Sequence, residues 1–401
     1  MYSAGEPARE RRAHGFDRVA IAGALLGLYG LFGCSYLTVR ATRISAPEGI
    51  SAFAALGFGS LLLLSLPMAA SLAFSLVRRR RRRDLALAVL SRFIVLFCLF
   101  EVGVAAHGIA GPDNPFARVS PGPGAWLVVM GGYMIMSSCR EAARSRRTYK
   151  MFCWGFWAGL ALLVFSGQLN DLSIMKELAN RQDRFAGELA RHLLLSFSAV
   201  SLGLVLGFPL GLLAFRKKAA GTGILAVVNT LQTVPSLALF GLLIAPLAWL
   251  GRSFPALSAA GVGGIGWTPA LVALSIYSLL PIVHNTIVGF HILDPSVREA
   301  GKGMGMNSWQ LFTRAEMPLA LPVIAAGVRI SGVQAVGNTA VAALIGAGGL
   351  GQFIFQGLGE AAPDLVLLGA LPTVLLAVSV DAIMRRVSEW LRPGGMEALS
   401  P

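Results

Sequence analysis

The chain has 401 residues, of which 55% are apolar and only 13% are charged, and its formal net charge is +14. Soluble domains carry about 25% charged residues, so this composition excludes an ordinary soluble globular protein. The Lys and Arg residues lie in short clusters between apolar runs, which the positive-inside rule explains without nucleic acid as a partner. The composition therefore indicates a polytopic α-helical protein embedded in a lipid bilayer.

Apolar runs predict the architecture. A run of roughly 20 apolar residues is long enough to cross a bilayer as a helix. We expect an all-α membrane protein with about ten transmembrane helices, with the run at 124–139 short for a span. The runs lie at about 19–39, 50–77, 85–110, 124–139 and 151–169, and then at about 190–215, 224–250, 269–290, 320–345 and 364–384.

Basic clusters constrain the topology of these helices. They lie at Arg9–Arg18, Arg78–Arg83, Arg140–Lys150, Arg216–Lys218, Arg298–Arg314 and Arg385–Arg386. If the N-terminus is cytoplasmic, about ten spans place every cluster, and both termini, on the cytoplasmic side. The expected segments are a cytoplasmic basic tail (1–18), an N-terminal membrane domain of about five helices (19–170), a polar periplasmic linker (171–189), a second membrane domain (190–390) and a cytoplasmic tail (391–401).

Several residues inside the runs are unusual for membrane helices. Gly203, Gly207 and Gly211 recur every four residues and share one helix face, where a second helix can approach closely, either within the subunit or between subunits. Pro209 is expected to kink its helix, and Pro235 and Pro281 are expected to break theirs. Glu101 either bonds to a neighbouring helix or lines a polar path, whereas Arg329 is near enough to a helix end to snorkel.

No residue pattern indicates chemistry on the chain itself. Cysteines lie at 34, 98, 139 and 153 without a C-x-x-C pair, so we interpret them as small apolar residues, not as metal ligands or disulfides. A phosphate-binding G-x-x-x-x-G-K-[ST] motif does not occur in the sequence. We therefore expect neither a cofactor, nor a metal, nor ATP binding, nor a catalytic site.

A polar loop between two apolar runs is the most informative segment. Asp294 and Pro295 predict the start of a short helix, and Gly303 and Gly305 allow a sharp turn after it. A capping box predicts a second short helix, which should end before Pro318. This projection would present Arg298, Glu299, Trp309, Phe312 and Arg314, either to a docking protein or, as an amphipathic connector, to the lipid surface. The capping box consists of Asn307 and Gln310.

The loop resembles the EAA loop of ATP-binding-cassette importer permeases, whose pattern is EAA, three residues, G, nine residues and I-x-L-P. Glu299, Gly305 and Pro318 match it, while Gly301, Ala315 and Met317 are mild departures. Five further segments resemble the osmoprotectant branch that carries glycine betaine, carnitine or choline: NTLQTVPSLALFGLL (229–243), YSLLPIVHNT (277–286), GMGMNSWQLF (303–312), MPLALPVIAAGVRI (317–330) and ALIGAGGLGQFIFQGL (343–358). The additional N-terminal spans resemble YehY-type permeases.

This resemblance implies a fold and a set of partners. Residues 190–390 would form a type I, MetI-like importer transmembrane domain in a bacterial inner membrane, paired with a second copy as a homodimer. A separate ATPase would dock on the loop, with Glu299, Ala300 and Gly305 central to the contact and Gly301, Trp309 and Pro318 beside them. A periplasmic substrate-binding protein would deliver the osmoprotectant. The alternative is an ion-coupled secondary transporter, which needs intramembrane carboxylates near broken helices.

Three glycines form a dinucleotide-like pattern, but their context argues against a cofactor. Gly346, Gly348 and Gly351 spell G-x-G-x-x-G, yet an apolar membrane run precedes them where a nucleotide-binding motif needs a strand. The better interpretation is a flexible or partly re-entrant turn, which the family resemblance places near the translocation path.

Overall fold

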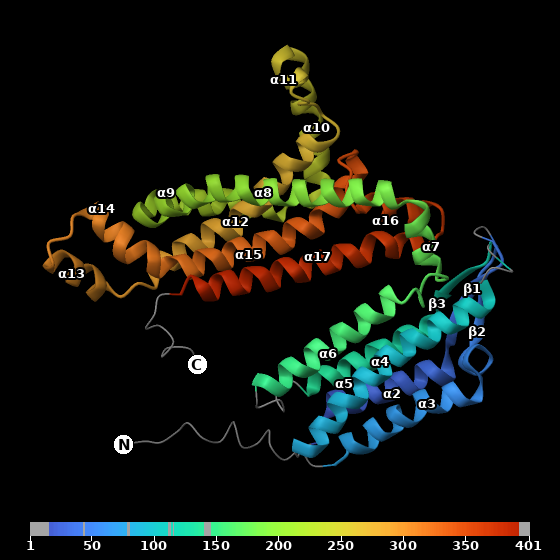
Figure 1. The fold of residues 1–401 in the computed structure, drawn as a ribbon. Helices are drawn as coiled ribbons and strands as arrows, with labels where there is room; N and C mark the ends of the chain where they lie inside the picture. Colours follow the sequence, from blue (N-terminus) through green and yellow to red (C-terminus); the bar gives the residue numbers. More distant parts are fainter. Residues whose placement is uncertain are drawn as a thin grey trace, which may run out of the picture. The chain divides into compact units, whose positions relative to one another are not determined.

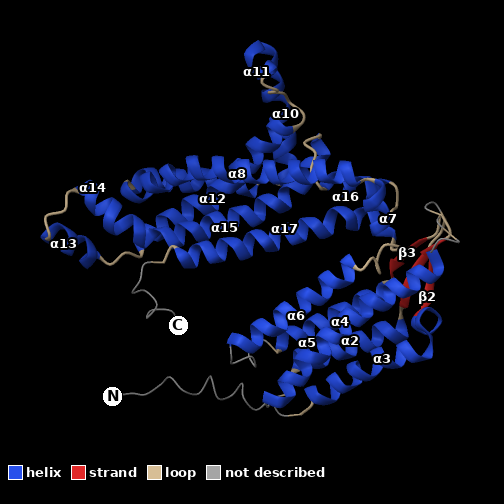
Figure 2. Ribbon diagram, viewed as in Figure 1, coloured by secondary structure: helices blue, strands red, loops and turns tan. Residues whose placement is uncertain are grey.

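The computed structural model describes residues 16–42, 45–77, 81–110, 114, 116–139 and 146–392. The chain folds as two compact units that divide between Asn180 and Arg181, and both consist mainly of helices (Figures 1 and 2). The tails predicted at 1–18 and 391–401 lie outside the described residues, except for 16–18 and 391–392.

Six helices make up most of the first unit: α2 (Arg18–Gly33), α3 (Ala52–Ser75), α4 (Arg81–Ala110), α5 (Pro123–Ser138), α6 (Arg146–Phe165) and α7 (Ser173–Asn180). Helices α2 and α5 approach closely because glycines lie at their contact. A Cβ atom on Gly23 would lie 2.7 Å from the Gly131 carbonyl oxygen, and one on Gly30 would lie 2.7 Å from that of Gly124. Small residues thus permit backbone contact between these two helices.

A small antiparallel sheet, which the sequence analysis did not predict, lies at one end of the first unit. It contains β1 (Ser35–Arg40), β2 (Glu48–Ser51) and β3 (Arg118–Pro121) in the order β2-β1-β3. The apolar run predicted at 19–39 is therefore a helix only as far as Gly33. Its last part, SYLTVR, is rich in aromatic and β-branched residues, and its backbone pairs with strands on both sides.

Glu101 bonds to a neighbouring helix in this unit. Its carboxylate is buried and accepts a hydrogen bond of 3.0 Å from the Ser60 hydroxyl of α3. The nearby Tyr36 hydroxyl donates to the Cys98 carbonyl oxygen at 3.2 Å. Of the two roles expected for Glu101, this geometry supports the interhelical bond.

Four long helices make up most of the second unit: α8 (Gln182–Arg216), α12 (Trp267–His291), α15 (Met317–Ala342) and α17 (Pro363–Trp390). Shorter helices are α9 (Lys218–Thr233), α10 (Ser236–Ser253), α11 (Pro255–Ala259) and α16 (Gly351–Gly359). Helices α8 and α12 pack through the predicted glycine face, since Cβ atoms on Gly203 and Gly211 would lie 2.5 and 2.6 Å from the Cβ atoms of Ser278 and Thr286. These glycines therefore serve contact within one subunit.

Two prolines shape the second unit in different ways. The run predicted at 224–250 is not one helix, because the extended Val234 and Pro235 separate α9 from α10. Pro281, in contrast, lies inside the unbroken α12, so the predicted break there is wrong. Proline cannot donate to the carbonyl four residues earlier, and the Gln232 amide donates to that carbonyl, of Tyr277, at 3.1 Å instead. The Tyr277 hydroxyl in turn donates to the Val234 carbonyl at the α9–α10 break.

Membrane-spanning helices dominate the described chain. Seven helices are long and apolar enough to cross a bilayer, and two shorter apolar helices add to them. The ten predicted runs correspond to α2, α3, α4, α5, α6, α8, the α9–α10 pair, α12, α15 and α17. The predicted class of a polytopic helical membrane protein is confirmed.

Candidate functional site

The polar loop forms the helical projection that its caps predict. Helix α13 (Pro295–Gly303) begins at Asp294, whose carboxylate accepts a hydrogen bond of 2.8 Å from the Ser296 backbone N–H. This backbone bond, supported by the Ser296 hydroxyl, holds the pKa of Asp294 below its usual value. Ionised Asp294 therefore stabilises the start of α13 at neutral pH.

A tight turn and a capping box connect the two short helices. Gly305 has a φ angle of +77°, a conformation that favours glycine, whereas Gly303 is still helical and is not part of the turn. Helix α14 (Ser308–Leu311) starts at Asn307, whose side chain accepts from the Gln310 N–H at 2.8 Å. The Gln310 side chain accepts from the Asn307 N–H at 3.0 Å, which completes the predicted capping box.

The second short helix ends at Leu311, before Pro318 as expected, but the chain stays helical across the proline. A π-helical segment (Phe312–Glu316, η2) joins α14 directly to α15, and Pro318 lies in the first turn of α15. The Met317 N–H bonds to the Phe312 carbonyl five residues earlier. The missing N–H of Pro318 thus falls at the change from π to α register, where the helix tolerates it.

The predicted loop residues have different environments. Glu299, Ala300, Gly305 and Trp309 are exposed, and Trp309 leaves 71% of its surface accessible. Gly301 is buried, and a Cβ atom there would lie 2.5 Å from Leu311 Cδ1. Gly301 therefore lets α13 and α14 approach each other, and the surface of the projection is formed by the residues around it.

Arg298 and Phe312 fasten the projection to the membrane helices instead of facing outward. The Arg298 Nε atom lies 2.6 Å from Glu316 Oε1, and its guanidinium stacks over Phe215 at the end of α8. Phe215, Phe290 and Phe312 form a stack with ring centroids 5.4 and 5.9 Å apart. Through this cluster the projection contacts α8 and α12 directly, and η2, which holds Phe312 and Glu316, continues into α15.

The predicted glycine turn lies at the opposite end of α15. Gly346 and Gly348 have φ angles of +77° and +81°, and Gly351 begins α16, with a short 3₁₀ segment (η3, Ala343–Ile345) before the turn. The Gly349 N–H donates to Glu188 at 2.5 Å, and the Leu350 N–H donates to His192 at 3.3 Å. No local sequence pattern indicates these α8 partners, because they lie more than a hundred residues away in the chain.

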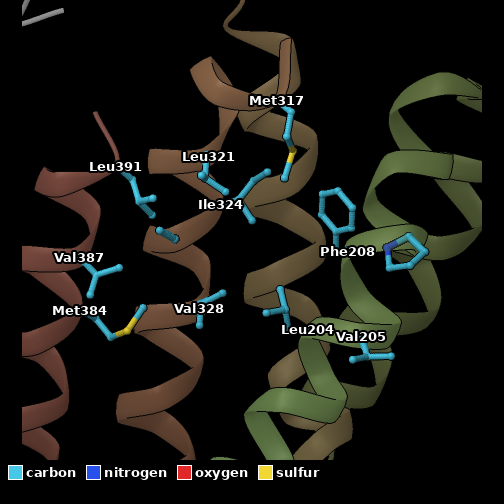
Figure 3. Close-up of a pocket in the computed structure, with 12 residues that line it drawn as sticks. Leu204, Val205, Phe208, Met317, Leu321, Ile324, Val328, Met384, Val387 and Leu391 are labelled. Carbon is cyan, nitrogen blue, oxygen red and sulfur yellow. The ribbon is translucent and has the colours of Figure 1, made fainter. Parts of the chain in front are cut away.

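Two further features complete the second unit. Arg329 of α15 does not merely snorkel: its Nε atom lies 3.7 Å from Asp381 of α17, which also bonds Arg385. An apolar pocket of about 460 Å³ lies between α8, α15 and α17 (Figure 3). Its lining, which includes Phe208 and Ile324, offers a polar solute no hydrogen-bonding side chain, so this pocket fits lipid better than cargo.

Two family models match the chain. Residues 17–175 match the N-terminal domain of the ABC transporter permease YehY, and residues 201–393 match the binding-protein-dependent transport system inner membrane component. The two matched regions fall in the two compact units.

Curated relatives match about half of the chain. The carnitine transport permease protein OpuCB of Listeria monocytogenes is 41% identical over 203 residues, which cover 51% of this chain and 86% of that protein. The osmoprotectant import permease protein OsmW of Salmonella typhimurium is 41% identical over 206 residues, or 51% and 91% of the two chains. The choline transport system permease protein OpuBB of Bacillus subtilis is 40% identical over 209 residues, or 52% and 88%.

A solved structure also matches about half of the chain. The structure, described as the inward facing MetNI methionine ABC transporter, is 21% identical and covers 53% of this chain and 98% of its own, with a TM-score of 0.45.

A bundle of membrane-spanning helices with a rigid polar projection, matched by these models, defines the permease subunit of an importer. The chain belongs to the family of binding-protein-dependent transport system inner membrane components, and it carries the YehY-type N-terminal domain ahead of that region. It is accordingly a multi-span inner-membrane permease subunit, as the resemblance in its loop and flanking segments predicted.

Proposed function

We propose that this permease imports an osmoprotectant, a small quaternary amine such as glycine betaine, carnitine or choline. The support is the identity of about two residues in five with permeases whose names specify carnitine, choline or osmoprotectant transport. The family model for the binding-protein-dependent inner membrane component matches residues 201–393, which include the segments around the α9–α10 break and the glycine turn.

Coupling to a separate ATPase through the 291–317 loop is the mechanism that the geometry supports best. Glu299, Ala300 and Trp309 are exposed on two capped short helices, so a partner can reach them without unfolding the loop. The Arg298–Glu316 pair and the phenylalanine stack join this surface to α8, α12 and α15. Movement of the ATPase would therefore reach the membrane helices through direct contacts.

The remaining arrangement follows the charge distribution. With the loop and both termini in the cytoplasm, residues 1–18 and 391–401 are cytoplasmic tails, 19–170 and 190–390 are membrane domains and 171–189 is a periplasmic linker. A binding protein delivers the solute to the face that carries the glycine turn at 346–351. A second copy of the chain completes the pore as a homodimer.

Reconstitution with partners tests this function. The chain is inserted in proteoliposomes with and without a cognate ATPase and binding protein, and uptake of labelled glycine betaine is measured. Uptake that requires ATP and both partners is the expected result. Uptake by the chain alone, driven by an ion gradient, would instead establish the secondary transporter.

A substitution on the loop tests the coupling surface. Glu299→Arg should abolish ATP-driven uptake while the protein still inserts and assembles in the membrane, because charge reversal at an interface costs affinity and orientation. Glu389→Arg, an exposed reversal at the adjoining end of α17, is the matched control and should transport normally. Normal uptake by Glu299→Arg would contradict the coupling role.

A further inference from the structure

Helix α9, which packs beside the membrane helices α8 and α12, exposes a polar face. Thr222, Asn229 and Thr233 are exposed, and their spacing, with Ala226 between them, places them on one side of the helix. Among the large apolar side chains of α9, all of which the structure describes, Val227 alone is exposed. Between Ala219 and Thr233 the helix also carries no charge. This face is therefore neutral, hydrogen-bonding and accessible.

The outer faces of neighbouring helices are different in kind. Helix α8 exposes Leu194, Phe197 and Val205, and α17 exposes Leu375 and Val378, all of them large and apolar. Such surfaces suit lipid tails, whereas polar side chains in membrane helices usually face the bundle interior or a water-filled cavity. The second unit thus presents one side to lipid and another side, which includes α9, to a polar medium.

Helix α15 provides an independent observation of the same kind. Gly337 is exposed, and Gln334 and Asn338 are partly exposed. At about 100° per residue, this face lies opposite Val328 and Val336, which line an apolar pocket with α8 and α17. Within the described part of the chain, the amides of Asn229, Gln334 and Asn338 have no side-chain hydrogen bond. Their hydrogen-bonding capacity is available to whatever fills the adjoining space.

The break between α9 and α10 directly follows Thr233, the last residue of the polar face. Gln232 donates to the Tyr277 carbonyl that Pro281 leaves unpaired. The Tyr277 hydroxyl donates to the Val234 carbonyl at the break, so the break is held in place by the middle of α12. Figure 1 shows α9 running along α8 and α10 leaving the bundle after the break. Interrupted membrane helices are tolerated where they line a cavity, and in transporters they mark solute sites.

We propose that the neutral polar face of α9, formed by Thr222, Asn229 and Thr233, and the amides of Gln334 and Asn338 contact the solute during its passage. The inference rests on the proposed function and identifies the chemical class that these groups suit, a small zwitterion or monovalent cation. Amide and hydroxyl oxygens can solvate an ammonium group, and amide N–H groups can donate to a carboxylate. Because this face carries no fixed charge, it would bind the ammonium and carboxylate groups of the solute weakly enough for rapid release.

Thiol accessibility tests the location of this path. All four native cysteines lie in the first unit, at 34, 98, 139 and 153, and are replaced by serine in the full chain. Single cysteines then replace Asn229, Thr233 or Gln334, with Val205→Cys and Val378→Cys as controls on the apolar faces. Each variant is assembled with the ATPase and binding protein in proteoliposomes. A membrane-impermeant quaternary-ammonium thiosulfonate should react with the polar-face cysteines at least about tenfold faster, as expected for water-exposed against lipid-exposed positions. Excess glycine betaine should slow that reaction.

Two results would overturn the inference. One is reaction at Asn229→Cys and Thr233→Cys that is no faster than at the controls. The other is spontaneous disulfide formation between two copies at these positions without reagent reactivity, which would identify a dry contact between subunits. ATP-driven uptake by the cysteine-free parent is measured in parallel. If the cysteine-free parent takes up the solute but the single-cysteine variants do not react, this path is refuted and the proposed function stands.

A second variant tests direct contact with the solute. Asn229→Leu should lower glycine betaine uptake by about tenfold, the loss of roughly one hydrogen bond, while ATPase stimulation by the binding protein persists. Asn229→Gln should restore most of the uptake because it keeps the amide. Equal uptake by Asn229→Leu and the parent would contradict contact at this residue.

Discussion

Arg298 and Glu299 are neighbours in sequence but have opposite roles in the projection. Successive helix positions differ by about 100°, so one side chain turns toward α15 and the phenylalanine stack while the other faces solvent. The sequence predicted that both side chains lie on the surface, because a charged residue looks the same in the sequence whether it forms an internal ion pair or faces solvent. Their separation depends on Glu316 and Phe215, which come from distant parts of the chain, and a local pattern contains no record of such partners.

A charge exchange tests the anchoring role of Arg298. Arg298→Glu and Glu316→Arg should each uncouple ATP hydrolysis from uptake, because each replaces a partly buried ion pair, now 2.6 Å long, with two like charges. The expected loss is roughly 2 kcal/mol of loop stability. The measurement is the ratio of solute imported to ATP hydrolysed.

The double variant serves as the critical control. Arg298→Glu combined with Glu316→Arg re-forms an ion pair and should recover much of the coupling ratio, whereas Arg386→Glu, an exposed reversal on α17, should leave it unchanged. If the double variant is as defective as the single ones, the ion pair is not what fastens the projection.

At the scale of elements, capping signals were predicted well and chain-distant effects were not. The start of α13 at Asp294 and the Asn307–Gln310 capping box are local hydrogen-bond patterns, so the sequence contained all the information needed. The π segment before Pro318 and the unbroken α12 at Pro281 depend on which group replaces a missing N–H. For Pro281 that group is Gln232, on another helix.

The small sheet was missed for a related reason. Residues 35–40 continue an apolar run, and hydrophobicity alone does not distinguish a buried strand from the end of a membrane helix. Their strand conformation depends on β3, whose residues 118–121 lie about eighty positions later in the chain. The candidate path residues were missed because exposure can only be judged once the helices have been placed side by side.

The glycine face of α8 leads to a stability prediction. Gly203→Ala should destabilise the second unit by about 1–3 kcal/mol, because its Cβ would lie 2.5 Å from that of Ser278 and force α8 away from α12. Gly187→Ala, in the same helix but with no atom within 4 Å of the added Cβ, should be neutral or stabilising by about 0.5–1 kcal/mol. Thermal unfolding in detergent measures both. Equal effects would mean that α8 and α12 do not pack through this face.

At the scale of the whole molecule, we predict that transport does not require the additional spans. The relatives align with 51–52% of the chain, and the inner membrane component family model matches residues 201–393, within the second compact unit. Residues 181–401, expressed alone, should therefore insert, assemble with the ATPase and binding protein, and import glycine betaine. Uptake in proteoliposomes is the measurement. A folded but inactive second unit would show that the YehY-type domain takes part in the transport cycle itself.

The early end of α2 has a consequence for the surrounding lipid. Its 16 residues span only about 24 Å, against a hydrocarbon core of about 30 Å, and the paired strand β1 that follows prevents the helix from extending. Such hydrophobic mismatch is relieved when the bilayer thins, at a fraction of a kcal/mol per Å. The full chain should therefore unfold at a higher temperature in short-chain than in long-chain phosphatidylcholine, and residues 181–401 should show a smaller difference. If thickness affects both equally, the mismatch is not localised at α2. If the difference is larger for the full chain, the first unit makes this permease sensitive to the thickness of its own membrane.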